Sequence, residues 1–107
     1  MSRKKSAYEV LGIASGADDA EIRQAYRRLA GRAHPDRHDA DADASADAHE
    51  RFLEIKAAYE VLIDPVRRTA HDEDPEGVLA AEQYRERRRA QIRRRRNRLR
   101  KLYDDRT

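Results

Sequence analysis

The sequence predicts an all-α fold built around a helical hairpin. Apolar residues recur at the spacing of one helix face in two segments, about 19–33 and 48–63. Between them, Pro35 cannot continue the first helix and disfavours helical backbone at His34. Residues that favour helix N-termini precede three of the expected helices. Two apolar faces joined by a polar loop should pack against each other as an antiparallel pair.

The first two helices begin and end at recognisable signals. Ser6 and Glu9 have the spacing of a capping box, and Gly12 can end the short helix that follows. Asp18 repeats the same signal before the helix of 19–33.

The apolar faces of the two long helices form the expected core. They comprise Ile22, Ala25, Tyr26, Leu29, Ala33, Phe52, Ile55, Ala58, Tyr59 and Leu62. Helical spacing accounts for the aromatic residues among them, so no cofactor role is needed. The tripeptide His34-Pro35-Asp36 would lie at the exposed tip of the hairpin.

Two further helices are expected in the second half of the chain. Asp64-Pro65 combines an N-cap with proline at the first helical position, which predicts a short helix to about His71. Asp74-Pro75 starts a last helix, about 76–103, whose beginning Gly77 should weaken.

Composition limits the size of the core and the class of protein. Charged residues make up 42% of the 107 residues and aromatic residues only 6%, which predicts one small domain with an appendage. There is no cysteine, which excludes disulfides and thiolate metal sites and fits a reducing compartment. No apolar run approaches the ~20 residues of a membrane span, and no signal-peptide apolar region is present. We therefore expect a cytoplasmic monomer.

Charge is divided unevenly along the chain. Residues 1–83 carry a net charge of −6, whereas residues 84–103 carry +10, with 11 Lys and Arg residues against one Glu. Such a division predicts a tail that binds anions. The residues expected to bind a polyanion such as RNA are Arg87, Arg88, Arg89, Arg93, Arg94, Arg95, Arg96, Arg98, Arg100 and Lys101.

Other interpretations of the tail remain open. Arg88 and Arg95 interrupt its sparse apolar stripe, which weighs against an anionic membrane surface. The stripe consists of Ala81, Tyr84, Ile92, Leu99 and Leu102. Repulsion among the arginines weighs against a stable isolated helix. One interpretation is therefore a tail that becomes helical only when it binds a partner. Contact with a nucleic acid or the ribosome is a further interpretation, and we favour an RNA-like polyanion over an inert solvated tail.

Residues 37–48 alternate Asp and Ala and are predicted to form a flexible acidic linker. The ligand positions of an EF-hand calcium loop would be filled by Asp39, Asp41, Asp43, Ser45, Asp47 and Glu50. However, Ala44 stands where the sharp turn of that loop needs glycine. The linker is therefore the favoured interpretation.

Metal binding and catalysis lack support in the sequence. The histidines are His34, His38, His49 and His71. Pro35 breaks the helix that would bring the first two together on one face. No phosphate-binding glycine loop and no activated nucleophile are apparent. We expect no enzyme activity, no cofactor and no metal.

Three segments resemble the J domain of DnaJ-type co-chaperones: AYEVLGI, EIRQAYRRLAGRAHPDR and RFLEIKAAYEVLIDPVRR. His34-Pro35-Asp36 begins eight residues after Tyr26, and the resemblance covers about residues 6–72 in order, which leaves 73–107 as a basic helical extension. It implies a protein that docks on an ATP-bound DnaK-type heat-shock chaperone (heat-shock protein 70) and stimulates its ATP hydrolysis. Such a module shifts a conformational equilibrium in its partner and performs no chemistry itself.

The resemblance also implies which residues dock. The basic face of the 19–33 helix would contact an acidic surface of the chaperone's ATPase domain, and Asp36 would engage a cationic group at a domain junction. The implied docking residues are His34, Pro35, Asp36, Arg23, Arg27, Arg28 and Arg32. Without the resemblance, the arginines would be interpreted as a solvated helix face. Gly31 and Ala33 depart from the family pattern and suggest a looser helix end, and His71-Asp72 replaces the usual Tyr-Asp.

No Gly/Phe-rich linker, CxxCxGxG zinc repeat or β-sandwich segment is present, so we expect a J-domain-only protein tethered by its basic helix. One alternative is a nucleic-acid- or ribosome-binding adaptor that uses the hairpin as a scaffold. Another is a degenerate J-like domain that binds the chaperone without stimulating it. The intact His34-Pro35-Asp36 argues against the latter.

Overall fold

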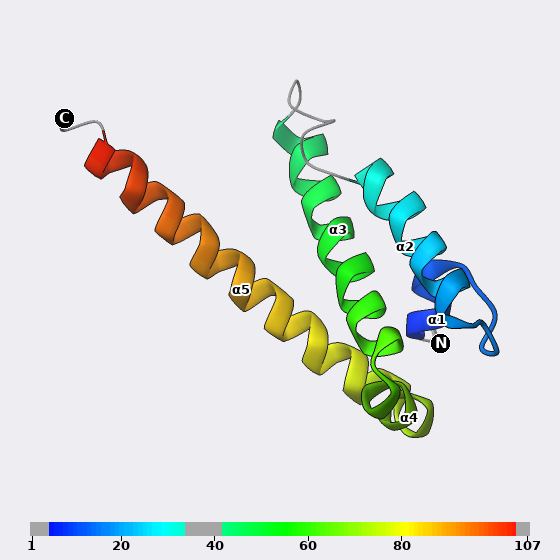
Figure 1. Cartoon of the computed structure of the whole chain (residues 1–107). Helices are drawn as coiled ribbons and strands as arrows, with labels where there is room; N and C mark the ends of the chain where they lie inside the picture. Colours follow the sequence, from blue (N-terminus) through cyan, green and yellow to red (C-terminus); the bar gives the residue numbers. More distant parts are fainter. Residues whose placement is uncertain (1–4, 34–41, 105–107) are drawn as a thin grey trace.

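The computed structural model describes residues 5–33 and 42–104, and this part of the chain contains five helices and no strand. The helices are α1 (Ala7–Leu11), α2 (Asp19–Ala33), α3 (Ala42–Ile63), α4 (Pro65–Glu73) and α5 (Pro75–Asp104). α2 and α5 flank α3, and α4 turns the chain between α3 and α5 (Figure 1). The predicted all-α hairpin with a long C-terminal helix is confirmed. None of the helices in the described ranges is long and apolar enough to cross a membrane.

Local hydrogen bonds fix the helix ends as predicted. The Oγ of Ser6 accepts a hydrogen bond from the N–H of Glu9 at the start of α1. Gly12 ends this helix in the left-handed region, with a φ of 69°. The carboxylates of Asp18 and Asp64 accept backbone N–H bonds of 2.9 Å at the starts of α2 and α4.

The hairpin core lies between α2 and α3. Ile22 of α2 and Ile55 and Ala58 of α3 are buried, and the rings of Tyr26 and Tyr59 stack with centroids 4.3 Å apart. Further buried residues of α3 are Leu53, Ala57, Val61 and Leu62. Half-buried against the same core are Tyr26, Leu29, Phe52 and Tyr59. α3 is therefore the central helix, which the other helices cover.

The predicted start of the third helix, at about residue 48, is wrong. α3 already begins at Ala42, so residues 42–47 of the expected acidic linker are helical. Alanine is the strongest helix former, and acidic residues are favoured near a helix N-terminus, which accounts for the earlier start. Because 42–50 is helical, this segment does not form the loop that an EF-hand site requires. Asp39 and Asp41 of that hypothesis lie outside the described residues.

α5 packs along the side of α3 that faces away from α2 (Figure 1). Its buried residues are Leu79, Glu82, Glu86 and Ala90, at a spacing that places them on one helix face. Leu79 belongs to the same core cluster as Leu11 and Leu62. The division at residue 72 into two units stays a prediction.

Candidate functional site

Arginine side chains cover the outward half of α2. Successive residues are about 100° apart around a helix, so these side chains spread over the half opposite buried Ile22, Ala25 and Ala33. This α2 arginine face consists of Arg23, Arg27, Arg28 and Arg32, all exposed. The Nε of Arg27 donates a hydrogen bond of 3.4 Å to the carbonyl oxygen of Arg23, within the helix. The arrangement is an exposed cationic strip on a helix whose other face is packed.

The α2 arginine face runs towards the C-terminal end of the helix at Ala33. His34-Pro35-Asp36 follows directly in the sequence and lies outside the described residues. Gly31 lies one turn or less from this end and is exposed, and no atom lies within 4 Å of the point where a Cβ would be. Packing therefore gives no reason for a glycine here.

Tyr26 holds α2 against α3 from the opposite side. Its ring stacks on Tyr59, and burial, with a smaller effect of the Glu60 carboxylate, raises the pKa of the Tyr26 hydroxyl. The arginines thus stand on a helix that an aromatic contact fixes to the centre of the fold.

The predicted polyanion-binding residues of α5 fall into two groups. Arg87 forms an ion pair of 3.3 Å with Glu50 of α3, and Arg89 pairs with Glu82 and Glu86. Exposed elsewhere along the helix are Arg88, Arg93, Arg94, Arg95, Arg96, Arg98, Arg100 and Lys101. Because α3 lies between α2 and α5, the fold keeps the two predicted cationic surfaces apart (Figure 1).

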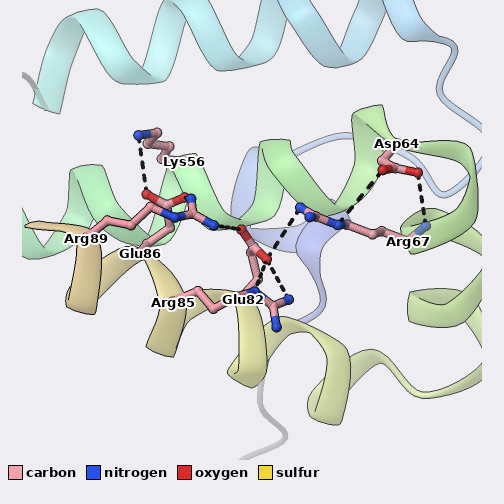
Figure 2. Close-up of polar contacts among 7 residues, drawn as sticks. All are labelled: Lys56, Asp64, Arg67, Glu82, Arg85, Glu86 and Arg89. Carbon is pink, nitrogen blue, oxygen red and sulfur yellow. Dashed lines mark hydrogen bonds and ion pairs between the residues drawn. The ribbon is translucent and has the colours of Figure 1, made fainter.

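Glu82 and Glu86 form a buried carboxylate cluster that the sequence analysis missed (Figure 2). Arg85 donates two hydrogen bonds, of 2.9 and 2.7 Å, to Oε2 of Glu82. Nη1 of Arg67, on α4, lies 3.5 Å from the same oxygen. Nη2 of Arg89 lies 3.5 Å from Oε1 of Glu82. Glu82 thus joins the start of α5 to α4.

Glu86 joins α5 to α3. Nζ of Lys56 lies 3.3 Å from Oε2 of Glu86, and Arg89 hydrogen-bonds to Oε1 (Figure 2). Both glutamates have 0% exposed side chains, so their charges depend on these partners. Their spacing with Leu79 and Ala90 is the signal that could have revealed the docked face of α5.

A second missed network joins α4 to α1. Nε2 of His71, which is 1% exposed, accepts a hydrogen bond of 3.1 Å from the N–H of Ala7. Nδ1 must then carry the proton and lies 3.2 Å from Oδ1 of Asp72, which also accepts a bond of 2.9 Å from the Tyr8 hydroxyl. Arg68 donates to that hydroxyl at 3.0 Å and to two backbone carbonyls before α2. His71 is therefore a structural residue here.

His49 of α3 lies close enough to α5 for the charges of that helix to affect its pKa. Burial, followed by the positive charges of Arg94 and Arg93, lowers the pKa of His49, while Glu50 acts in the opposite direction. Within the described part of the chain, no cluster of three or more His, Cys, Asp and Glu side chains has a metal-binding arrangement.

Comparison with known proteins finds relatives for the part of the chain that contains α1, α2, α3 and most of α4. The sequence model of a family described as "DnaJ domain" matches residues 6–72, so α5 lies beyond the match. Chaperone protein DnaJ of Enterococcus faecalis is 48% identical over 73 residues, which cover 68% of this chain and 18% of that protein. Chaperone protein DnaJ of Acidithiobacillus ferrooxidans is 60% identical over 65 residues, covering 61% and 16%. The chain thus spans less than a fifth of the length of these relatives.

Solved structures agree with the sequence matches. The J-domain of the DnaJ homolog dnj-2 precursor from C. elegans has a TM-score of 0.61 and 32% identity, and the match covers 76% of this chain and 85% of that chain. The J-Trx1 fragment of ERdj5 has a TM-score of 0.60 and 38% identity, covering 68% and 33%. Sequence and fold therefore point to the same family.

Proposed function

Because this chain belongs to the DnaJ domain family, we propose that it docks on a DnaK-type chaperone and stimulates its ATP hydrolysis through His34-Pro35-Asp36. Membership implies a co-chaperone of the Hsp70 system, in a family that is not enzymatic. Beyond family membership, we propose that the α2 arginine face docks on the chaperone, that the tripeptide stimulates hydrolysis and that α5 is a tether.

The observation that carries the proposal is the α2 arginine face and its direction. Four exposed cations on the outward half of α2 lead to the tripeptide that follows Ala33. Complementary charge accelerates and orients docking more than it adds affinity. The arginines would hold the partner's acidic surface while Asp36 engages a cationic group, and the complex would favour the hydrolysing conformation of the chaperone.

The tether would be the exposed cationic part of α5. Since α3 separates it from α2, a polyanion on α5 would leave the α2 arginine face accessible. Location on a polyanion, and not direct client binding, would then provide specificity.

A single-turnover ATPase assay with a DnaK-type chaperone tests the proposal. His34→Gln should abolish stimulation and leave the helical circular dichroism unchanged. His38→Gln makes the same chemical change four residues later and should retain stimulation. Stimulation that survives His34→Gln would refute the role of the tripeptide. A wild-type chain that binds the chaperone without stimulating it would instead support the degenerate J-like domain.

The docking face is tested by charge reversal. Arg27→Glu and Arg28→Glu should each weaken stimulation, more strongly at low salt because exposed charges are screened at high salt. Arg88→Glu makes the same change on exposed α5 and should leave stimulation unaffected. Equal effects at α2 and α5 would mean that net charge, and not the α2 arginine face, governs the reaction.

A further inference from the structure

The first half of α5 packs against the rest of the molecule, whereas the second half is exposed. Residues 75–90 include the buried Leu79, Glu82, Glu86 and Ala90. Every residue from Gln91 to Asp104 is exposed, and the helix diverges from α3 over this stretch (Figure 1). We call residues 91–104 the α5 arm. It extends from a docked base, so the carboxylate cluster sets its direction.

Most cations of the docked half form ion pairs with acidic residues of the protein itself. Arg85 and Arg89 pair with the buried glutamates, and Arg87 with Glu50. The α5 arm carries seven Lys and Arg residues against one acidic residue, Asp104. The cationic surface offered to a partner is therefore the arm and not the whole basic segment.

The distribution of charge around the arm constrains the shape of the partner. At about 100° per residue, the cations point to every side of the helix axis. A flat membrane would contact one side only and leave the remaining arginines in water. A second copy of the arm would bring like charges together. A groove with phosphates along both walls surrounds a helix and would engage cations on several sides.

An apolar line on the arm fits the floor of such a groove. Ile92, Leu99 and Leu102 are 58, 58 and 64% exposed, on the side of the helix opposite Ala90. A helix with its side chains is about 10–12 Å across, and the B-form major groove is about 12 Å wide, with thymine methyl groups on its floor. The major groove of A-form RNA is too narrow for side chains to read.

We propose that the α5 arm binds in the major groove of double-stranded DNA. This inference rests on the proposed tether function and specifies its polyanion. The arm is about 21 Å long, which corresponds to about six base pairs, and phosphate contacts would dominate with little base preference.

The test is fluorescence anisotropy of the full chain with a labelled 20-base-pair DNA duplex at several salt concentrations. The logarithm of the affinity should fall against the logarithm of salt with a slope of about 4–6, since each phosphate contact contributes about 0.9. Arg96→Gln in the arm should reduce this slope by about one contact. Arg51→Gln removes the same charge from an exposed position on α3 and should leave the slope nearly unchanged.

Duplex RNA of the same sequence and vesicles rich in anionic lipid are the competing partners. Duplex DNA should bind at least tenfold more tightly than duplex RNA. Equal or tighter binding of RNA would overturn the DNA assignment and leave the tether intact. Preferential vesicle binding that is lost in Ile92→Ala/Leu99→Ala would overturn it in favour of a membrane surface. Absence of salt-dependent binding to all three would refute the tether as well.

Discussion

Nζ of Lys56 on α3 lies 3.3 Å from the buried Oε2 of Glu86 on α5, so an ion pair crosses the interface that docks the basic helix. The two partners differ in exposure, because the Lys56 side chain is 22% exposed and that of Glu86 is 0% exposed. Removal of the lysine strands a buried charge, whereas removal of the glutamate frees a cation that can reach water.

The first prediction follows from this asymmetry. Lys56→Met should destabilise the fold by about 2–4 kcal/mol, somewhat less than the ~3–5 kcal/mol for a fully buried broken pair, because Arg89 still contacts Glu86. Glu86→Leu should change stability by less than about 1 kcal/mol or increase it. Urea unfolding measures both, with exposed Arg51→Met and Glu54→Leu on α3 as controls. Equal losses for the two cluster variants would contradict the argument.

His49 provides a second prediction, on pH. Its lowered pKa means that the folded state resists protonation, so acidification below the ordinary value of 6.5 should favour the unfolded chain. Arg94→Gln should raise the His49 pKa only part of the way, since burial is the larger cause. An NMR titration of the imidazole measures this, with Arg98→Gln as the control. An unchanged titration in Arg94→Gln would mean that the first turn of the α5 arm does not lie near His49 of α3.

Two helical glycines should respond to alanine with opposite signs. Gly31→Ala should stabilise the chain by about 0.5–1 kcal/mol, because the added Cβ meets no atom and alanine favours helix. At Gly77, the Cβ would collide with the carboxylate of Asp74, whose Oδ1 accepts the Gly77 N–H at 3.2 Å. Gly77→Ala should therefore give no gain or cost up to about 1 kcal/mol through the lost cap.

Thermal unfolding of Asp74→Ala/Gly77→Ala distinguishes these causes. With the capping carboxylate already removed, alanine at position 77 should become stabilising relative to Asp74→Ala alone. If Gly77→Ala is stabilising in the wild-type background, the cap does not explain the glycine.

Local signals predicted the helices well, because they depend on residues close in sequence. The bounds of α2 agree with the predicted 19–33, and the caps at Ser6, Asp18 and Asp64 are confirmed. The early start of α3 was missed because alternating Asp and Ala was interpreted as low complexity, although alanine favours helix.

The docking of α5 was harder to predict, because its contacts join residues far apart in sequence. The sequence shows an apolar stripe that includes Tyr84 and Ile92, yet these residues are 64 and 58% exposed in the structure. The packed face contains Glu82 and Glu86, whose burial depends on Lys56 and Arg67 from other helices. The tripeptide His34-Pro35-Asp36 lies outside the described residues, and its role stays a prediction.

A fourth prediction concerns the histidine that replaces the family's usual tyrosine. His71→Phe should keep the edge-on ring contact with Tyr8 but leave the buried N–H of Ala7 without its acceptor. A stranded buried donor costs about 1–3 kcal/mol, which urea unfolding would detect. Asp72→Asn, on the exposed side of the network, should cost less. A neutral His71→Phe would show that the bond from Ala7 contributes nothing to stability.

The last prediction separates the docked base of α5 from the α5 arm. A chain ended after Ala90 keeps the carboxylate cluster and should retain its unfolding temperature and ATPase stimulation but lose DNA binding. A chain ended after Asp74 should still fold as a helical unit and stimulate the chaperone. However, it loses buried Leu79 and should be less stable by about 2–5 kcal/mol or more.

Circular dichroism melts and the single-turnover assay compare the two truncations at a temperature where both are folded. If the chain ended after Asp74 is unfolded at every temperature, residues 6–72 are not an independent unit and α5 is part of the domain. If the chain ended after Ala90 melts as early as the shorter one, the arm contributes to the core despite its exposure. Stimulation lost with the arm alone would mean that tether and tip act together, because the docked base and the α2 arginine face are unchanged in that chain.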